Sequence, residues 1–330
     1  MSTETKTMPK VADVDAADIF VLVLMPHLPA FGVDKPLDID VCGRTFTGWI
    51  EHTVEPFEHA KVEISKSDDI LSVVRNNAGR HKWTVVVYAD TPLLTRESIE
   101  LAVAYASTFE HKAARMPRGW VFETAGVKDT QLVEASPVPN LDEEDFIVAY
   151  NYAQVALVSS IMRGRINTMH LRKGVHIIDP MNAYISAEAT IGKGTTIGPG
   201  VVLRGECKIG KHCHISNYVE IKNSIIGDKT KIKHMSYVGD ATIGDECNIG
   251  CGVVFCNYDG QTKENITLGD KVFVGSNCNL VAPLTLANNS YIASGSTITQ
   301  DVPKDGLGIA RARQAIKEGW NLKKDEETEE

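Results

Sequence analysis

No apolar run in this sequence approaches the ~18 residues needed to span a membrane. The N-terminus, MSTETKTMPKVADVDAAD, also lacks an apolar core behind a basic start, so we expect no secretory signal and a cytoplasmic location. Basic residues are outnumbered: Lys and Arg total 34 against 43 Asp and Glu, for a net charge of −9. This balance argues against nucleic-acid binding, which relies on clustered Lys and Arg.

Cysteine is also scarce, and its spacing does not suit a metal. The seven cysteines include no CxxC pair, so we do not expect a zinc cluster. In a cytoplasmic protein they are interpreted as reduced thiols. The remaining composition, 43% apolar and 23% charged over 330 residues, is that of a globular protein and suggests two domains.

A six-residue repeat of aliphatic residues dominates the second half of the chain. It slips by one residue twice, is interrupted once, and glycine commonly follows the aliphatic residue. This period is typical of a parallel β-helix of the left-handed type, in which three hexapeptides make one triangular coil of roughly six to seven stacked strands per face. The repeat positions are Ile185, Ile191, Ile197, Leu203, Ile209, Ile215, Ile221, Ile226, Ile232, Val238, Ile243, Ile249, Leu268, Val274, Leu280, Leu286, Ile292 and Ile298.

Two departures from the repeat have different interpretations. Four cysteines stand four residues after an aliphatic position, where other repeats carry Thr, Val or Ser, and are interpreted as packing residues. The nineteen-residue interval from Ile249 to Leu268 exceeds three hexapeptides by one and predicts a loop that leaves the coil, a favoured location for a site. The four packing residues are Cys207, Cys213, Cys247 and Cys278.

The first half alternates strands and helices, which predicts a small α/β domain. Thr95 is the expected N-cap of its longer helix, and Gly174 is expected to end a connecting helix. Strands are expected over 19–24, 60–64, 83–88, 120–124 and 129–134, and helices over 65–79 and 95–112. The predicted divisions are a disordered segment 1–17, an α/β domain 18–144, a helix 145–174, the β-helix 175–304, and a C-terminal segment with an acidic tail 305–330.

Several long motifs resemble one family, the bifunctional N-acetylglucosamine-1-phosphate uridyltransferase/glucosamine-1-phosphate N-acetyltransferases. They are RINTMHLRKGVHIIDP, TIGPGVVLRG, NYVEIKNS, HMSYVGDATIGDECNIGCGVVFCNYDG, VFVGSNCNLVAP and DVPKDGLGIARARQAIKEGW. The resemblance covers about residues 150–320 and implies that the β-helix is the acetyltransferase domain, active as a homotrimer with sites between subunits. It implies acetyl-CoA as co-substrate, in a cell-wall precursor pathway leading to UDP-N-acetylglucosamine.

The resemblance also implies roles for individual residues, and their chemistry suits those roles. A histidine can accept a proton near neutral pH, while arginine and lysine recognise phosphate. Arg204 and Lys222 also depart from the repeat consensus, so the scaffold alone does not explain them. The implied catalytic residues are His234 as base with Asn257 and Tyr258; substrate contacts are Arg204, Lys222, Tyr237, Asn248 and Lys263; acetyl-CoA contacts are Cys251, Ser276, Ser294 and Arg311.

Three features depart from the family pattern. The family has Arg-Pro-Gly where this chain has Arg204-Gly205-Glu206, and many members have alanine in place of Cys251 and Ser294. In the family the inserted loop reaches a neighbouring subunit, which would place Lys263 in the next protomer's site.

The first domain departs further from the family. No glycine cluster follows its first strand, so backbone N–H groups cannot close on nucleotide phosphates. The segment VVVYADTPLLT matches, and it places Asp90 at the family's metal-binding aspartate, but the second ligand, an asparagine, falls on Tyr150. We interpret the domain as a degenerate nucleotidyltransferase that has lost uridyl transfer, with Mg²⁺ expected only if it is active.

The leading hypothesis is therefore acetyl-CoA-dependent N-acetylation of glucosamine-1-phosphate. A second hypothesis is acetylation of another amino-sugar phosphate or a nucleotide-linked amino sugar, which the change at Gly205 keeps open. A third is a non-catalytic sugar-phosphate-binding regulator or scaffold. A retained uridyltransferase activity would predict UTP- and magnesium-dependent release of pyrophosphate.

Overall fold

The computed structural model describes residues 14–127 and 135–320. The chain divides into two compact units, Met1–Thr168 and Met169–Glu330. Most of the segment expected to be disordered, the strand expected over 129–134 and the acidic tail lie outside the described residues. Within the described part of the chain, no helix is long and apolar enough to cross a membrane.

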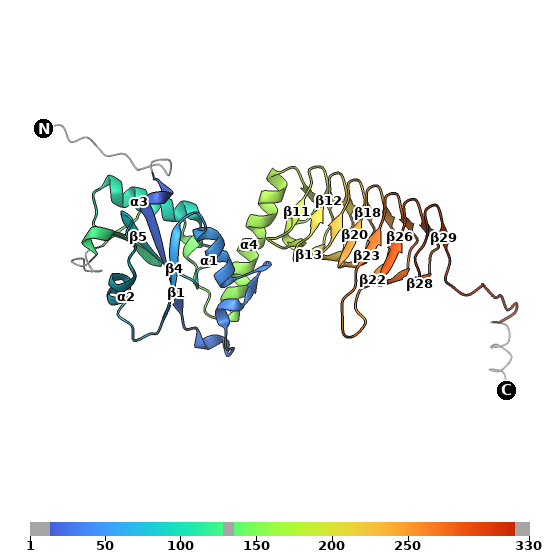
Figure 1. The fold of residues 1–330 in the computed structure, drawn as a ribbon, viewed down its shortest axis with the longest axis horizontal. Coiled ribbons are helices and arrows are strands. Elements are labelled where there is room, and N and C mark those ends of the chain that lie inside the picture. Colours follow the sequence, from blue (N-terminus) through green and yellow to red (C-terminus); the bar gives the residue numbers. More distant parts are fainter. Residues whose placement is uncertain (1–13, 128–134, 321–330) are drawn as a thin grey trace. The chain divides into compact units, whose positions relative to one another are not determined.

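The first unit is built on one six-stranded sheet (Figure 1). Its first three strands are parallel, and β7 then runs antiparallel to β5. Strands β1 and β5 are buried along most of their length because their residues are almost all apolar. The order is β4 (Glu58–Ile64), β1 (Ile19–Pro26), β5 (Trp83–Tyr88), β7 (Gly119–Glu123), β6 (Ala113–Met116) and β8 (Ser136–Pro137).

Helices and a short hairpin complete this unit. The predicted strands over 19–24, 60–64, 83–88 and 120–124 are confirmed, and Thr95 caps its helix by accepting a hydrogen bond from Ser98 N. The helices are α1 (Phe46–Val54), α2 (Ile70–Asn77), α3 (Arg96–Thr108) and α4 (Tyr152–Arg172), with short 3₁₀ turns at 16–18, 29–31, 36–38, 124–126 and 143–146; β2 (Asp40–Val41) pairs with β3 (Arg44–Thr45).

Helix α4 begins seven residues later than the sequence predicts. Asn151 caps it, since its Oδ1 accepts hydrogen bonds from the backbone N–H groups of Ala153 and Gln154. The residues expected to form the first turns of this helix instead contact α3. The buried Asp145 carboxylate accepts hydrogen bonds from the Thr95 and Ser98 hydroxyls at 2.5 and 2.6 Å. Arg165 of α4 donates to the same carboxylate at 2.9 Å and to Leu93 O at 2.7 Å. This network ties α4 to α3.

The second unit is the predicted left-handed parallel β-helix (Figure 1). Its coils stack into three parallel sheets, which we call faces 1, 2 and 3. Face 1 contains β10 (184–185), β13 (202–204), β16 (220–222), β19 (237–239), β22 (254–256), β25 (279–281) and β28 (297–298). Face 2 contains β11 (190–191), β14 (208–209), β17 (225–226), β20 (241–243), β23 (266–268) and β26 (284–286). Face 3 contains β9 (176–177), β12 (196–197), β15 (214–215), β18 (231–232), β21 (248–249), β24 (273–274), β27 (291–292) and β29 (307–308).

The interior of the β-helix consists of the predicted aliphatic residues. On face 1, Ile185, Leu203, Ile221 and Val238 stand in register in successive coils, and all are buried. Their neighbours in each strand point outward because side chains alternate along a strand. Strand β29 pairs with β27, so the β-helix continues past the boundary predicted at residue 304.

The four packing cysteines occupy the interior next to the corners, as predicted. The Cys213 thiol donates to Gly227 O at 3.1 Å and the Cys247 thiol to Gly269 O at 3.0 Å, both in the following coil. Thr195 and Thr230 make the equivalent bonds with their hydroxyls. Burial raises the pKa of the Cys247 thiol to about 11, so it stays protonated and unreactive at neutral pH.

The predicted start of the interruption of the six-residue repeat, directly after Ile249, is wrong. Phe255 continues the repeat six residues after Ile249 and is fully buried on face 1. The insertion therefore begins after Cys256 and ends before Ile266, and it projects from the side of the β-helix near β22 (Figure 1). An aromatic residue at an aliphatic position, followed by a polar loop, concealed this repeat in the sequence.

Candidate functional site

His234 lies at the corner where face 3 turns into face 1, and its side chain is exposed. The same corner of the next coils carries Cys251, Ser276 and Ser294. Backbone hydrogen bonds connect this column: Gly252 N donates to His234 O at 3.1 Å, Asn277 N to Cys251 O at 2.8 Å, and Gly295 N to Ser276 O at 2.9 Å. The residue predicted as base and the predicted acetyl-CoA contacts thus form one straight column, which we call the His234 corner.

Arg311 joins this column from the segment after the last coil. A Cβ atom added to Gly295, which neighbours Ser294, would lie 3.8 Å from Arg311 Cδ. Its guanidinium therefore lies at the end of the column away from His234, several coils along the β-helix. Such a linear arrangement suits a long ligand with its reactive end at His234 and an anionic end at Arg311.

Face 1 carries a cluster of cations at its opposite edge, where its strands turn into face 2. Arg204 of β13 and Lys222 of β16 are neighbours in register, both with outward side chains. Lys263, from the inserted loop, lies close to the Lys222 ammonium of the same chain, and this like charge lowers the pKa of Lys222, with smaller contributions from burial and from Arg204. Three cations this close favour an anion that all of them can contact.

Tyr237 and Asn257 lie beside the cations. A Cβ on Gly239 would lie 2.3 Å from Tyr237 Oη and 2.9 Å from Asn257 Nδ2. The absence of a side chain at Gly239 thus lets the tyrosine hydroxyl and the asparagine amide approach each other over β19. Asn257 is buried, which distinguishes it from the exposed His234 and Tyr258.

Asp240 is a site residue that the sequence analysis missed. Asn257 Nδ2 donates to Asp240 Oδ2 at 2.5 Å, and Asn223 Nδ2 donates to the other oxygen at 3.4 Å. Asn223, Asp240 and Asn257 occupy one corner of three consecutive coils, and the first two have positive φ, which Asn and Asp tolerate best among residues with a side chain. The two one-residue slips fall at this corner, so they were the available signal.

The inserted loop is shaped by its own hydrogen bonds. Asp259 accepts from the backbone N–H groups of Gln261 and Thr262, and these bonds, that from Thr262 first, lower the pKa of its carboxyl. Tyr258 and Lys263 form a β-bridge, and Tyr258 Oη donates to Gly260 O at 2.6 Å. The loop is therefore held in a defined conformation that directs Lys263 back to face 1 of its own chain.

Two predicted residues need separate comment. Asn248 belongs to β21 on face 3, whereas Lys222 and Tyr237 are on face 1, so one chain does not bring them onto the same surface. Arg204 is ion-paired with Glu220 at 3.4 Å in an exposed position. Gly205, the departure from the family pattern, has φ +65°, and a Cβ there would lie 2.1 Å from Asn223 Oδ1.

Asp90, in the first unit, does not have the surroundings of a metal ligand. Both of its carboxylate oxygens accept from Arg118, from Nε at 3.1 Å and from Nη2 at 2.5 Å. Burial raises the pKa of Asp90, and the Arg118 contacts partly offset this effect. Mg²⁺ binds through carboxylate oxygens, which here already face a guanidinium. The described residues also include no group of three or more His, Cys, Asp or Glu that could hold a metal ion. These residues do not fit a divalent cation.

Comparison with known proteins agrees with the β-helix motifs. A family model described as the GMPPB C-terminal domain matches residues 180–258. The bifunctional protein GlmU of Clostridium perfringens (strain SM101 / Type A) is 40% identical over 230 residues, which cover 54% of this chain and 51% of that protein. GlmU of Clostridium botulinum (strain Kyoto / Type A2) is 53% identical over 137 residues, which cover 42% and 30%.

Half of this chain resembles GlmU. The resemblance inferred from the motifs is thus confirmed, and the chain spans about half the length of the curated relatives it matches. Among solved structures, LpxA, a UDP-N-acetylglucosamine acyltransferase from Bacteroides fragilis 9343, matches with a TM-score of 0.36 and 22% identity over 41% of this chain and 57% of that chain.

Proposed function

We propose that this chain is an acetyl-CoA-dependent N-acetyltransferase that converts glucosamine-1-phosphate to N-acetylglucosamine-1-phosphate. The observation that carries this proposal is the position of two groups at the two edges of the same face of the β-helix, face 1. The His234 corner provides a base and a linear binding track, and face 1 provides three cations for a phosphate. GlmU similarity over half the chain supports the same assignment.

The residues divide the reaction between them. The Arg204, Lys222 and Lys263 cations hold the sugar phosphate, which orients the sugar over Tyr237 and Asn257. The substrate amine attacks the thioester carbonyl, His234 accepts the proton that the nitrogen loses, and the CoA thiolate leaves. The Asn257 amide and the backbone N–H of Tyr258 would stabilise the negative charge that develops on the acyl oxygen.

Asp240 would act on this chemistry through Asn257. A carboxylate that accepts one amide hydrogen of Asn257 orients the side chain and keeps its other polar atoms directed toward the site. We infer a positioning role, because Asp240 lies one coil before Asn257 at the corner between faces 1 and 2 and next to Lys222, whose positive charge it stabilises.

A homotrimer with sites shared between subunits is part of this proposal. Asn248 stands on a different face from the cation cluster, so in this proposal the sugar contact from Asn248 comes from a second chain beside the first. The β-helix also exposes large apolar side chains, among them Tyr184, Ile225 and Tyr291, which a neighbouring subunit would cover.

The direct test is steady-state turnover of acetyl-CoA with glucosamine-1-phosphate, followed by release of the CoA thiol. Activity in the unsubstituted protein, lost in His234→Ala, is the expected result. Absence of turnover in the unsubstituted protein, or full turnover in His234→Ala, would overturn the proposal. Sedimentation of the same protein should give a trimer.

A second candidate substrate class is another amino-sugar phosphate or a nucleotide-linked amino sugar. The observation that favours it is the Gly205 turn, together with the ion pair that holds Arg204 toward Glu220. A panel of amino-sugar phosphates and UDP-linked amino sugars, ranked by kcat/KM, separates the two. A higher value for a nucleotide-linked substrate would replace glucosamine-1-phosphate in the assignment.

A further inference from the structure

The first unit has a cavity at the carboxyl end of its parallel strands. It has a volume of about 450 Å³ and is lined by the ends of β1, β4 and β5 and by the segment around Tyr150. In open α/β sheets this end of the strands is where ligands bind. The charged groups on its wall are Lys66, Asp90 and Arg118, and His27 also lines it. We call this the Arg118 cavity.

Arg118 is held rigidly with donors to spare. Its guanidinium lies 4.0 Å from the centre of the Tyr88 ring, and two of its N–H groups are used by Asp90. An arginine has five N–H donors in a fixed plane, and the other three have no acceptor among the residues that the structure describes. Among the described residues that line the cavity, Asp90 is the only carboxylate, and Arg118 neutralises it.

Lys66 adds a positive charge that nothing on the cavity wall balances. It is exposed, and the described residues show no ion pair to its ammonium. With Asp90 cancelled by Arg118, the cavity has a net positive charge and directional donors. A cavity with a net positive charge and directional N–H donors can bind a phosphate or carboxylate group without a metal ion.

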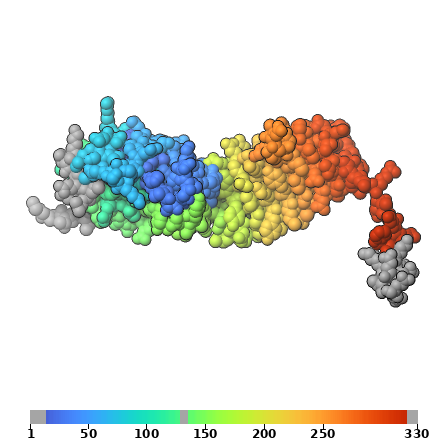
Figure 2. Space-filling view, turned by 90° about the horizontal axis from the view of Figure 1, so that it is seen from below, coloured from blue at the N-terminus to red at the C-terminus, as the bar shows by residue number. Residues whose placement is uncertain are grey.

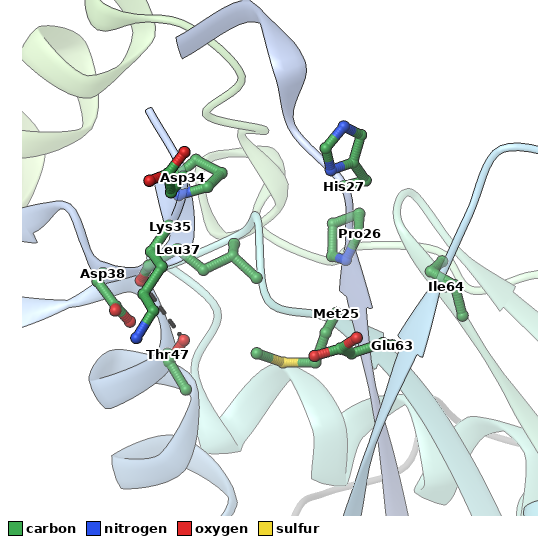
Figure 3. A pocket seen from close by; sticks show the side chains of 11 residues that line it. Met25, Pro26, His27, Asp34, Lys35, Leu37, Asp38, Thr47, Glu63 and Ile64 are labelled. Carbon is green, nitrogen blue, oxygen red and sulfur yellow. Dashed lines mark hydrogen bonds between the residues drawn. The ribbon is translucent and has the colours of Figure 1, made fainter. Parts of the chain in front are cut away.

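A second cavity of about 430 Å³ adjoins the first, since both are lined by Pro26, His27 and Ile64. Its charge is opposite: it contains three carboxylates, those of Asp34, Asp38 and Glu63, and one lysine, Lys35. Figure 3 shows Asp34, Lys35 and Asp38 on one side of this cavity, with Met25 and Glu63 across from them. Carboxylates accept hydrogen bonds from hydroxyl and ammonium groups.

We propose that these adjoining cavities bind one small dipolar molecule without a metal ion. Its phosphate or carboxylate lies against Lys66 and Arg118, and its hydroxyl or ammonium groups lie against Asp34, Asp38 and Glu63. Arg118 takes the place that a cation would need at Asp90. This site is separate from the acetyl-transfer site, and the proposal does not depend on the activity of that site.

The experiment measures ligand binding to a variant whose β-helix site has lost its phosphate-binding cations, so that the binding measured comes from the first unit. The full chain is prepared as Arg204→Ala/Lys222→Ala/Lys263→Ala, which removes the three cations of face 1, and is titrated calorimetrically in EDTA and then in Mg²⁺. The probes are inorganic phosphate, glucose-1-phosphate, glucosamine-1-phosphate and uncharged glucose. We expect the sugar phosphates to bind with the same Kd in EDTA and Mg²⁺, phosphate to bind more weakly, and glucose not to bind.

Adding Lys66→Ala to this background should weaken sugar-phosphate binding about tenfold, as expected for loss of one charge-assisted hydrogen bond. The matched control is Lys82→Ala, at the opposite end of β5, which should leave Kd unchanged. Because Arg118→Ala alone leaves a buried carboxylate unpaired, the second variant is Asp90→Asn/Arg118→Gln, which should also lose binding while its melting temperature is checked.

Three results would overturn the proposal: no binding of any probe, binding only when Mg²⁺ is present, or an unchanged Kd in Lys66→Ala. UTP binding that needs Mg²⁺ would likewise overturn it and point to a retained nucleotidyl site. Acetyl transfer, measured on the unsubstituted protein, is a separate result, so failure of either proposal can be told from failure of the other.

Discussion

The two units of this chain relate sequence to structure in different ways. In the β-helix each residue's neighbour is found by counting one coil along the chain, as with Leu203, Ile221 and Val238. In the first unit neighbours are distant and irregular, as with Asp90 and Arg118 or Asp145 and Arg165. The residues of a site can therefore be located from the sequence when the fold is a repeat. In a mixed sheet the site depends on contacts between distant segments, which no local sequence pattern predicts.

The largest expected effect tests whether the chemistry resides at the His234 corner. His234→Ala should lower kcat for acetyl transfer about 10²- to 10⁴-fold, the range for loss of a general base. The control is His214→Ala, an exposed histidine on face 3. Equal losses in the two variants would show that the assay reports stability of the β-helix rather than proton transfer.

The next effect concerns the long-range contacts of the first unit. Arg165→Met leaves the buried Asp145 carboxylate without its cation and should cost about 3 kcal/mol. Calorimetry should show the transition of the first unit at a lower temperature and the β-helix transition unchanged. The exposed Arg172→Met, in the same helix, is the control. A shift of both transitions would mean that the units do not unfold independently.

Thiol reactivity tests the proposed binding track. Cys251, partly exposed at the His234 corner, should be alkylated by iodoacetamide, whereas burial keeps Cys247 protonated and unreactive. Bound CoA should slow alkylation of Cys251 about tenfold at tenfold excess over its Kd, because it covers the thiol. Mass spectrometry of the labelled peptides measures both. Labelling of Cys251 that CoA does not change would place the CoA site elsewhere.

The smallest effect is on stability and comes from Lys222. Lys263 lowers the pKa of Lys222, so below that pKa the folded state holds a proton against repulsion. Lys222→Met should therefore stabilise the free protein by less than about 1 kcal/mol at neutral pH. This advantage should fade as pH rises through the lowered pKa, because Lys222 then releases its proton. The same variant should lose sugar-phosphate binding. Melting temperatures of the two proteins are measured across pH. A higher melting temperature for the unsubstituted protein than for Lys222→Met at neutral pH would contradict the repulsion within the cation cluster.

The sequence predicted the β-helix and most of the candidate site because both follow the repeat. Ile185 to Ile298 mark the interior, and His234, Cys251, Ser276 and Ser294 are brought together simply because coils stack. Phe255 was missed because an aromatic residue replaced the aliphatic signal before the insertion. Asp240 was missed because its importance lies in a hydrogen bond to a residue in the following coil.

By itself, the sequence determined the six-residue period, the residues that fill the prism and the polar groups that the scaffold does not need. Only the tertiary structure decided that Arg118 occupies both oxygens of Asp90, that Asp145 joins α3 to α4, and that Lys263 folds back onto Lys222. The physical reason is the range of the interactions. Burial of a repeating apolar face is encoded within each coil, whereas the partner of a charged side chain is chosen by the packing of segments far apart in the chain.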